Sequence, residues 1–330
     1  MQDQVPNVFL PFRDWASTAS QQQGIPEAFA SATYPLPDGS SSPNRLFSAR
    51  NEIEQRLTSR NPQDPVVLTS LARQVTLGWG DGVFRDFTGD IEAPHDNLHG
   101  WVRGDMGAVQ TAAYDPIFWV HHANVDRQWA VWQRMNGDGS VPDALLDAPL
   151  DPFGMTFRQV LDFACDLHYE YGPSDTPMPG TVTVPNLAGI FAMGPLPTVQ
   201  GRVLLHVRGL QMSTETYNVQ VFVNQAEADD KTPLAGNPHH AGMFSVFGMG
   251  AHVGHMQQRA QAVAHHALIG GHPASANLPP KSQVLDITEA VKKVVPPGQE
   301  IHLKLVATTN DGTPVDVRKV PFEGLRIEFQ

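Results

Sequence analysis

The chain has 330 residues, of which 41% are hydrophobic and 17% charged, and its formal net charge is −12. This composition is typical of a globular protein, and the length predicts two domains. The acidic balance, without a basic stripe, excludes a typical nucleic-acid binder. No apolar run approaches the roughly 20 residues of a membrane span. A single cysteine, Cys165, excludes an internal disulfide framework and a cysteine-rich zinc site.

The N-terminal half is predicted to be mainly helical. Residues 1–45 indicate extended chain and loops, whereas residues 46–60 and 64–78 indicate helices. In the second of these helices, Asp64 is the expected cap, and Pro65 suits the first helical position.

The helix that begins after Asp115 is the clearest predicted element. Pro116 fits its first position, and apolar or aromatic residues recur at three- and four-residue steps from Phe118 to Trp129. A further helix is predicted over residues 156–168, where an apolar stretch predicts that Cys165 is buried.

The C-terminal part has a different pattern. Residues 172–200 are rich in Pro, Gly and Thr and are predicted to be a linker. Short runs with a period of two follow, and residues 249–280 indicate a loop with a short helix. We therefore expect a mainly α domain over residues 1–171 and an all-β sandwich over residues 201–330. The predicted strands are Gly201–Gly209, Tyr217–Asn224, Gly242–Gly248, Gln299–Thr308 and Leu325–Gln330.

Two groups of histidines indicate a metal site. His95 and His99 are four residues apart, so a helix places both rings on one face, and Pro94 suits the start of that helix. His121 and His122 lie within the apolar helix, where a buried imidazole needs polar partners. Two surface histidines and a hydrogen-bonded core histidine are the alternatives. Imidazole suits copper, zinc, iron or nickel, and the spacing alone does not choose between them.

Longer motifs around these histidines resemble one protein family. HDNLHGW at residues 95–101 and DPIFWVHHANVDRQWAVW at residues 115–132 closely resemble the second copper motif of the type-3 copper proteins: tyrosinases, catechol oxidases and molluscan-type hemocyanins. The resemblance implies that His95, His99 and His122 bind copper and that His121 supports them by packing or hydrogen bonding.

Three other segments are similar to the same family. Val8–Trp15 looks like its LPYWDW segment, with Arg13 where a tryptophan is usual. Tyr169-Glu170-Tyr171 looks like the tyrosine motif that closes the catalytic domain. Residues 202–330 resemble the β-sandwich that follows the copper domain. That sandwich often covers the copper entrance, which implies a latent state, although the sequence does not identify the covering residue.

The resemblance also implies roles for residues near the ligands. Asp96 would orient or deprotonate an incoming phenol, and Glu92 would hold a water that assists this step. Gly100 would leave space at the mouth of the site, and Val109 would act as a small gate residue. Simpler alternatives are a favourable helix-dipole charge for Asp96, a packing glycine and a core valine.

Two more residues are assigned to the surroundings of the copper. Phe118 lies one turn before His122 on the predicted helix. Asp126 would orient a ligand through a hydrogen bond, or pair with Arg127 or Arg103.

The family binds two copper ions with three histidines each, but no histidine precedes His95 here. The first half-site is therefore missing from this sequence. Three explanations remain open: the sequence is a piece of a longer protein, which we favour; a separate chain supplies the missing half; or the dicopper chemistry has been lost. A cluster of C-terminal histidines has the spacing of a solvated loop rather than of a half-site. It consists of His239, His240, His252, His255, His265, His266 and His272.

The predicted function is copper-dependent oxidation of phenols or o-diphenols to quinones by dioxygen, and we expect this chain alone to be inactive. The alternatives are a hemocyanin-like oxygen carrier, a non-catalytic copper-binding half-protein and a zinc hydrolase. The expected partners are a phenolic small molecule and dioxygen, without nucleic acid or membrane. The first residues lack the features of a signal peptide, so we expect a soluble protein and assign no compartment.

Overall fold

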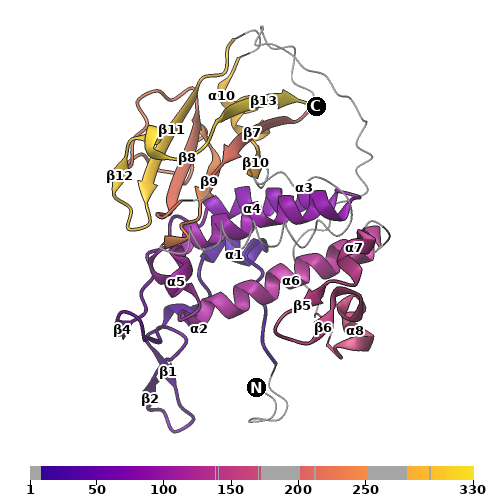
Figure 1. The fold of residues 1–330 in the computed structure, drawn as a ribbon. Helices are drawn as coiled ribbons and strands as arrows, with labels where there is room; N and C mark the ends of the chain where they lie inside the picture. The colour runs from indigo at the N-terminus through magenta and orange to yellow at the C-terminus, as the bar shows by residue number, and fades with distance from the viewer. Residues whose placement is uncertain are drawn as a thin grey trace.

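The computed structural model describes residues 9–137, 139, 141–169, 171, 201–211, 213–250, 281–296 and 299–330. The predicted linker at 172–200 and nearly all of the predicted loop at 249–280 lie outside these residues. Two antiparallel sheets lie on one side of the long helices α3 (Val67–Trp79) and α4 (Phe84–Val102), and α6 (Pro116–Asn136) lies on the other (Figure 1).

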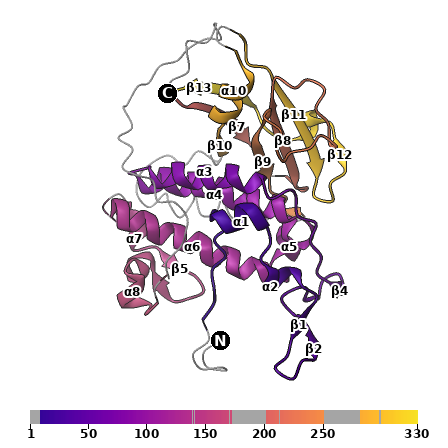
Figure 2. The same ribbon diagram turned by 180° about the vertical axis from the view of Figure 1, so that it is seen from behind.

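Short elements surround the three long helices. From behind, α1 lies in front of them, next to the extended N-terminal segment (Figure 2). These elements are α1 (Thr18–Gln23), α2 (Glu27–Ala30), α5 (Val109–Ala112), α7 (Asp143–Leu146), α8 (Phe163–Asp166), and the paired strands β1 (Thr33–Pro35) with β2 (Ser41–Pro43), β3 (Arg50–Asn51) with β4 (Arg56–Leu57), and β5 (Pro149–Leu150) with β6 (Met155–Thr156).

The predicted cap is present at the start of α6, whereas α3 begins at Val67, three residues after Asp64, and has no side-chain cap. The Asp115 side chain accepts a hydrogen bond from the backbone N–H of Ile117 at 2.9 Å, and Pro116 occupies the first position of α6. Helix α6 ends at Gly137, whose positive φ of 71° suits glycine. Asp115 also forms a buried ion pair with Arg60, with a closest distance of 2.6 Å, so the start of α6 is bound to the loop between β4 and α3.

Helix α4 is longer than the sequence indicated. Pro94 does not start it but lies inside it, ten residues after Phe84. A proline within a helix removes one hydrogen bond and usually costs about 3 kcal/mol. The helix persists because it is packed between α3, α6 and the sheets, with Leu98, Trp101 and Val102 fully buried.

The helix predicted over residues 46–60 is wrong, because the structure forms the β3–β4 hairpin there. A tertiary contact overrides the local pattern. The buried carboxylate of Asp105 accepts hydrogen bonds from Asn51 at 2.6 Å, Arg56 at 2.7 Å and the Ser59 backbone N–H at 2.7 Å. These bonds need the extended hairpin rather than a helix.

The helix predicted over residues 156–168 is also wrong. The structure has a 3-10 turn at Phe157–Val160 and then the single turn α8, which the Asp162 side chain caps. Cys165 is exposed rather than buried, because α8 lies at the surface.

The C-terminal part contains a four-stranded sheet, in the order β12-β11-β8-β9, and a three-stranded sheet, in the order β10-β7-β13. Its strands are β7 (Val203–Leu210), β8 (Tyr217–Val223), β9 (His240–Val246), β10 (Lys281–Asp286), β11 (Leu303–Thr309), β12 (Pro314–Val315) and β13 (Gly324–Phe329). The five predicted strands are present, within a few residues at their ends.

This part is not purely β, because helix α10 (Thr288–Val294) contributes Ala290 and Val291 to the core of the sheets. The prediction of an all-β unit is therefore corrected to a mixed one, and the division into domains stays a prediction. Within the described residues, no helix is both long and apolar enough to cross a membrane.

We expect Asp105→Ala to lower the free energy of unfolding by about 2–4 kcal/mol, because Asn51, Arg56 and the Ser59 N–H lose a charged acceptor. Asp147→Ala is the matched control. It removes an exposed pair with Arg158, and such pairs contribute about 0–1 kcal/mol. Urea denaturation measures both variants. Equal losses of stability would contradict the assigned role of Asp105.

Two acidic side chains meet between α3 and α4. Burial, followed by the hydrogen bond and charge of Asp90, raises the pKa of Asp81 from 3.8 to about 8. The pKa of Asp90 is raised as well, mainly by burial. The folded protein thus holds a proton that the unfolded chain releases near pH 4, which favours folding at low pH.

Stability should therefore fall as pH rises from about 4 to about 8, the window set by Asp81. We expect Asp81→Asn to flatten this slope and to stabilise the protein at pH 9 by roughly 1–2 kcal/mol after allowance for solvent screening. Denaturation at several pH values measures the slope. Parallel profiles for the variant and the wild type would show that the pair does not titrate in this window.

Candidate metal centre

Four histidine rings meet where α4 crosses α6. His95 and His99 come from successive turns of α4, and His121 and His122 come from the middle of α6. The centroid of the His95 ring lies 4.8 Å from that of His99, 5.1 Å from that of His121 and 5.1 Å from that of His122. One nitrogen from each ring lies within 4.8 Å of the other three. The structure thus brings together the three predicted ligands and adds His121.

The rings of α4 are oriented by hydrogen bonds on their outer nitrogens. Nδ1 of His99 donates to the carbonyl oxygen of Met106 at 2.7 Å, and Nδ1 of His95 contacts the Asp96 carboxylate at 2.9 Å. A carbonyl or carboxylate oxygen accepts a proton here, so Nδ1 is the protonated nitrogen in both rings. Nε2 of each ring then keeps its lone pair for a metal, as in many metal sites.

The rings of α6 have nitrogens without partners. His121 is fully buried, and neither of its nitrogens has a hydrogen-bond partner; the same holds for Nε2 of His122. Burial, followed by neighbouring histidines, holds the pKa of His99 and His121 well below 6.5 and lowers that of His122 to about 4. All three are therefore neutral at pH 7, which is the form that binds metals.

This donor set fits one metal ion. Four imidazoles suit copper or zinc, and the buried unpaired nitrogens would gain a partner from the ion. Across the part of the chain that the structure describes, this is the single group of at least three histidine, cysteine, aspartate or glutamate side chains found with such spacing.

Aromatic rings enclose the cluster from two sides. Phe118 lies against His122, with ring centroids 4.1 Å apart, as expected for a residue one turn away on α6. Phe247, which directly follows β9, stacks on His99 with centroids 4.4 Å apart and ring planes at 21°. The C-terminal part therefore covers the His99 ring with an aromatic side chain. The sequence did not identify this residue, because nothing in its local pattern distinguishes it from the neighbouring phenylalanines.

The two predicted acid–base residues occupy different places. Asp96 contacts His95, so it lies beside the cluster and positions a ligand ring. Glu92 is exposed on α4, one turn before His95, and does not belong to the group of potential ligands. Its role in holding a water stays a prediction.

Gly100 does not leave open space at the mouth of the site. A Cβ there would meet the Asn218 side-chain oxygen at 2.1 Å and the Ser245 hydroxyl at 2.3 Å. The packing role is therefore the correct one, because the missing side chain lets α4 approach β8 and β9. Val109 lies beside the covering segment, and its backbone N–H donates to the Gly248 carbonyl at 3.4 Å.

Asp126 is not part of the histidine cluster and does not form an ion pair with Arg127 or Arg103. Its carboxylate accepts hydrogen bonds from the hydroxyls of Tyr169, at 2.7 Å, and Tyr171. The tyrosine motif is thus fastened to α6, and Tyr171 also packs edge-on against Phe12 at 5.9 Å.

Arg13 is buried, and it occupies the position where the LPYWDW segment of the type-3 copper proteins has a tryptophan. Its guanidinium lies 5.2 Å from the Trp101 ring and donates to the Gly24 carbonyl at 3.0 Å. Burial, followed by the positive charge of Arg60, lowers the pKa of Arg13 to about 9. The arginine thus replaces the aromatic residue within the core.

The described C-terminal histidines do not form a second site. Nδ1 of His239 contacts the Val223 carbonyl at 2.7 Å, and Nε2 of His240 contacts Gln220 at 2.8 Å. The remaining predicted loop histidines, from His252 to His272, lie outside the described residues.

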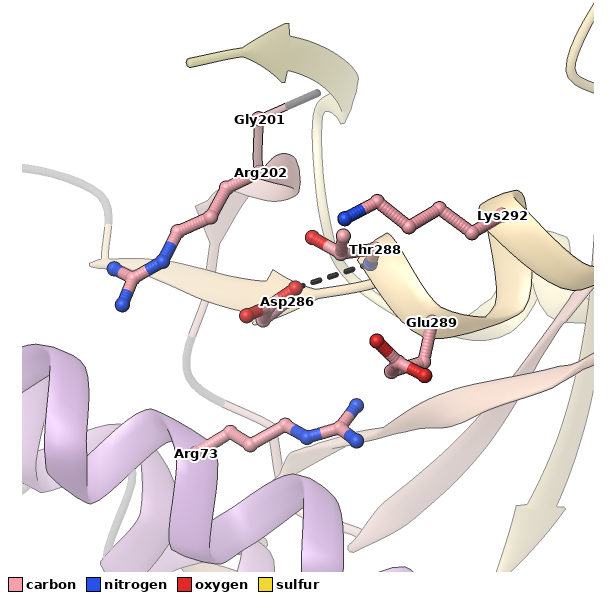
Figure 3. Close-up of a pocket in the computed structure, with 7 residues that line it drawn as sticks. All are labelled: Arg73, Gly201, Arg202, Asp286, Thr288, Glu289 and Lys292. Atoms are coloured by element: carbon pink, nitrogen blue, oxygen red, sulfur yellow. Dashed lines mark hydrogen bonds between the residues drawn. The ribbon is translucent and has the colours of Figure 1, made fainter. Parts of the chain in front are cut away.

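A cavity of about 370 Å³ lies apart from the histidines, between α3 and the start of α10 (Figure 3). Side chains of both charges face it, so it does not indicate the charge of a ligand. Its lining consists of Arg73, Gly201, Arg202, Asp286, Thr288, Glu289 and Lys292.

Parts of the sequence are similar to known copper proteins. Residues 1–135 match the family described as the common central domain of tyrosinase. The chain is 29% identical over 276 residues to unit D of the beta-C chain hemocyanin of Helix pomatia, covering 74% of this chain and 63% of that protein. It is 36% identical over 131 residues to a tyrosinase of Hahella sp. (strain CCB-MM4), covering 37% of this chain and 28% of that protein.

Solved structures show the same fold. A functional unit of octopus hemocyanin superposes with a TM-score of 0.60 at 19% identity, covering 97% of this chain and 76% of that one. Tyrosinase from Burkholderia thailandensis gives 0.60 at 16% identity, covering 99% and 84%. The chain spans less than two thirds of the two curated relatives named above. The match to the tyrosinase central domain, these relatives and the shared fold together support the type-3 copper protein family for this chain.

Proposed function

We propose that His95, His99 and His122 bind copper, and that this site takes part in the oxidation of phenols or o-diphenols to quinones by dioxygen. The match to the tyrosinase central domain implies copper binding. The observation that carries the proposal is the fixed orientation of His99, whose Nδ1 is bound to the Met106 carbonyl so that Nε2 faces the other rings. When bound, a pair of copper ions supplies the electron transfer between phenol and dioxygen.

The chain's own residues hold and shield the metal. Asp96 positions His95 through its Nδ1, so it acts on the substrate through a ligand rather than by removing a phenolic proton itself. Phe118 and Phe247 place apolar rings against His122 and His99 and keep water away from the cluster. A second copper would need ligands from residues outside those described here.

Phe247 bears on access to the site. Its ring occupies the face of His99 that a phenol ring would otherwise approach, at a centroid distance of 4.4 Å. We infer that the enzyme is latent while this ring is in place and that an o-diphenol enters when it moves aside.

Oxygen carriage is the second candidate. The same ring stack favours it, because dioxygen is much smaller than a phenol and needs less space beside Phe247. Several relatives are hemocyanins, including those of Helix pomatia and Megathura crenulata. A third candidate is a copper-binding half-protein without catalysis, which the single described cluster favours.

Saturating copper should raise the melting temperature of the wild type, because a ligand at 100 times its Kd stabilises the folded state by about 2.7 kcal/mol. His99→Gln should lose most of this shift, since it removes a fully buried ring with an oriented nitrogen. His302→Gln, which changes an exposed histidine, should keep it. Differential scanning calorimetry with and without copper measures the shift. An equal shift in both variants would place the copper elsewhere.

Phe247→Ala in the full-length, copper-loaded gene product should raise the initial rate of catechol oxidation about two- to tenfold. This range corresponds to an aromatic stack of about 0.5–1.5 kcal/mol that holds the cover in place. Phe153→Ala, which changes a ring that is 76% exposed, is the control and should leave the rate unchanged. Quinone absorbance and oxygen consumption are the measurements.

The same measurements separate the three candidates. Reversible oxygen uptake without quinone, in both the wild type and Phe247→Ala, would support the carrier and contradict the oxidase. One copper per chain with neither oxygen uptake nor quinone would support the non-catalytic half-protein.

A further inference from the structure

Arg13 brings a positive charge into the core of the helical part, where it is only 4% exposed. Its backbone N–H donates to the Val120 carbonyl at 2.9 Å, so it is bound to α6 directly before His121. Its guanidinium lies 5.2 Å from the centroid of the Trp101 ring, and Trp101 follows His99 by two residues on α4. Arg13 thus contacts both helices that carry the histidine cluster.

Within the described residues, no carboxylate forms an ion pair with this guanidinium. Its Nη2 donates to the neutral carbonyl of Gly24 at 3.0 Å, and its Nε and Nη1 are buried without a hydrogen-bond partner. Nearby acidic side chains are paired with other cations. Asp14 pairs with Arg127 at 3.4 Å, and Asp115 pairs with Arg60 at 2.6 Å. Buried charges are rare in proteins unless they are paired, so this positive charge is an unusual feature of the core.

The guanidinium stays charged at neutral pH. Burial, followed by the positive charge of Arg60, lowers the pKa of Arg13 to about 9, which is still well above 7. Its charge also acts on the cluster. Burial, then the other three histidines and then Arg13 hold the pKa of His121 well below 6.5. Charges in a protein interior interact more strongly than charges in water, so Arg13 also acts on an ion held by these rings.

We propose that Arg13 makes the copper site prefer cuprous over cupric ion and so raises the reduction potential of bound copper. The repulsion from a fixed positive charge is proportional to the charge of the ion, so it disfavours the cupric ion twice as much as the cuprous ion. The neutral tryptophan that is usual in the LPYWDW segment would have no such effect.

The inference rests on the proposed copper binding and deepens that function. Two o-diphenols release four electrons and four protons in becoming two quinones, and one dioxygen takes these up to form two waters. A higher reduction potential favours the transfer of electrons from the diphenol to the metal. Arg13 is thus a positioned charge that acts on the reaction through the metal, without touching the substrate itself.

The test measures the affinity of the 330-residue chain for each copper ion at pH 7. Bicinchoninate competes for the cuprous ion and nitrilotriacetate for the cupric ion. Arg13→Gln removes the charge, and we expect it to raise the cupric affinity on the order of tenfold more than the cuprous affinity. A tenfold change in this ratio corresponds to a reduction potential lower by about 59 mV.

Two further variants separate charge from shape. Arg13→Trp removes the same charge with a much larger side chain, so it should change the ratio in the same direction, and it serves if the glutamine variant does not fold. Arg318→Gln, which changes an exposed arginine, should keep both wild-type affinities. Equal changes of the two affinities in both Arg13 variants, or no change, would assign Arg13 to core packing alone and overturn the inference.

The same titrations test the proposed function separately. His99→Gln should weaken the binding of both ions, because it removes a ring of the cluster. Wild-type affinities in this variant would show that copper binds elsewhere, which contradicts the proposed function and the inference with it. A weakened His99→Gln together with an unchanged ratio in the Arg13 variants would overturn the role of Arg13 alone.

Discussion

The structure depends on a group of imidazoles whose candidate ligand nitrogens lie close together inside an apolar core. Their outer nitrogens are taken by Asp96 and the Met106 carbonyl, but those of His121 and Nε2 of His122 have no partner. Without a metal, such an arrangement is a cost to folding, which the packing of α4 and α6 must offset. Metal binding and folding stability are therefore coupled at this crossing.

Helix α4 contacts both the sheets and the histidine cluster, so it fixes their relative position. One face carries His95 and His99, while Asn97 accepts a hydrogen bond from the Ser245 backbone N–H of β9, and Gly100 lets that strand approach closely. Fixing β9 on α4 also fixes the residue that follows the strand. The stacking of Phe247 on His99 is thus a consequence of how the sheets are seated on the helix, and not of a separate loop.

The sequence predicted the features that depend on local patterns and missed those that depend on distant contacts. The four-residue spacing placed His95 and His99 on one helix face, and the family resemblance added His122. The Asp115 cap located the start of α6. The hairpin at 50–57 could not be predicted, because Asp105, which binds it, lies some fifty residues away. The burial of Pro94 within α4, the Gly100 contact and the Phe247 cover likewise depend on elements that meet only in the folded chain.

The cover over His99 can open without moving the sheets. Gly248, which follows Phe247, is held on both sides: its N–H donates to the Thr216 hydroxyl at 2.7 Å, and its carbonyl accepts from Val109 at 3.4 Å. The backbone at the cover is thus bound to Thr216, which directly precedes β8, and to the start of α5. A rotation of the Phe247 side chain breaks only the ring stack, worth about 0.5–1.5 kcal/mol, whereas lifting β9 would also break its bond to Asn97. A side-chain motion of Phe247 is therefore the easier way to uncover His99.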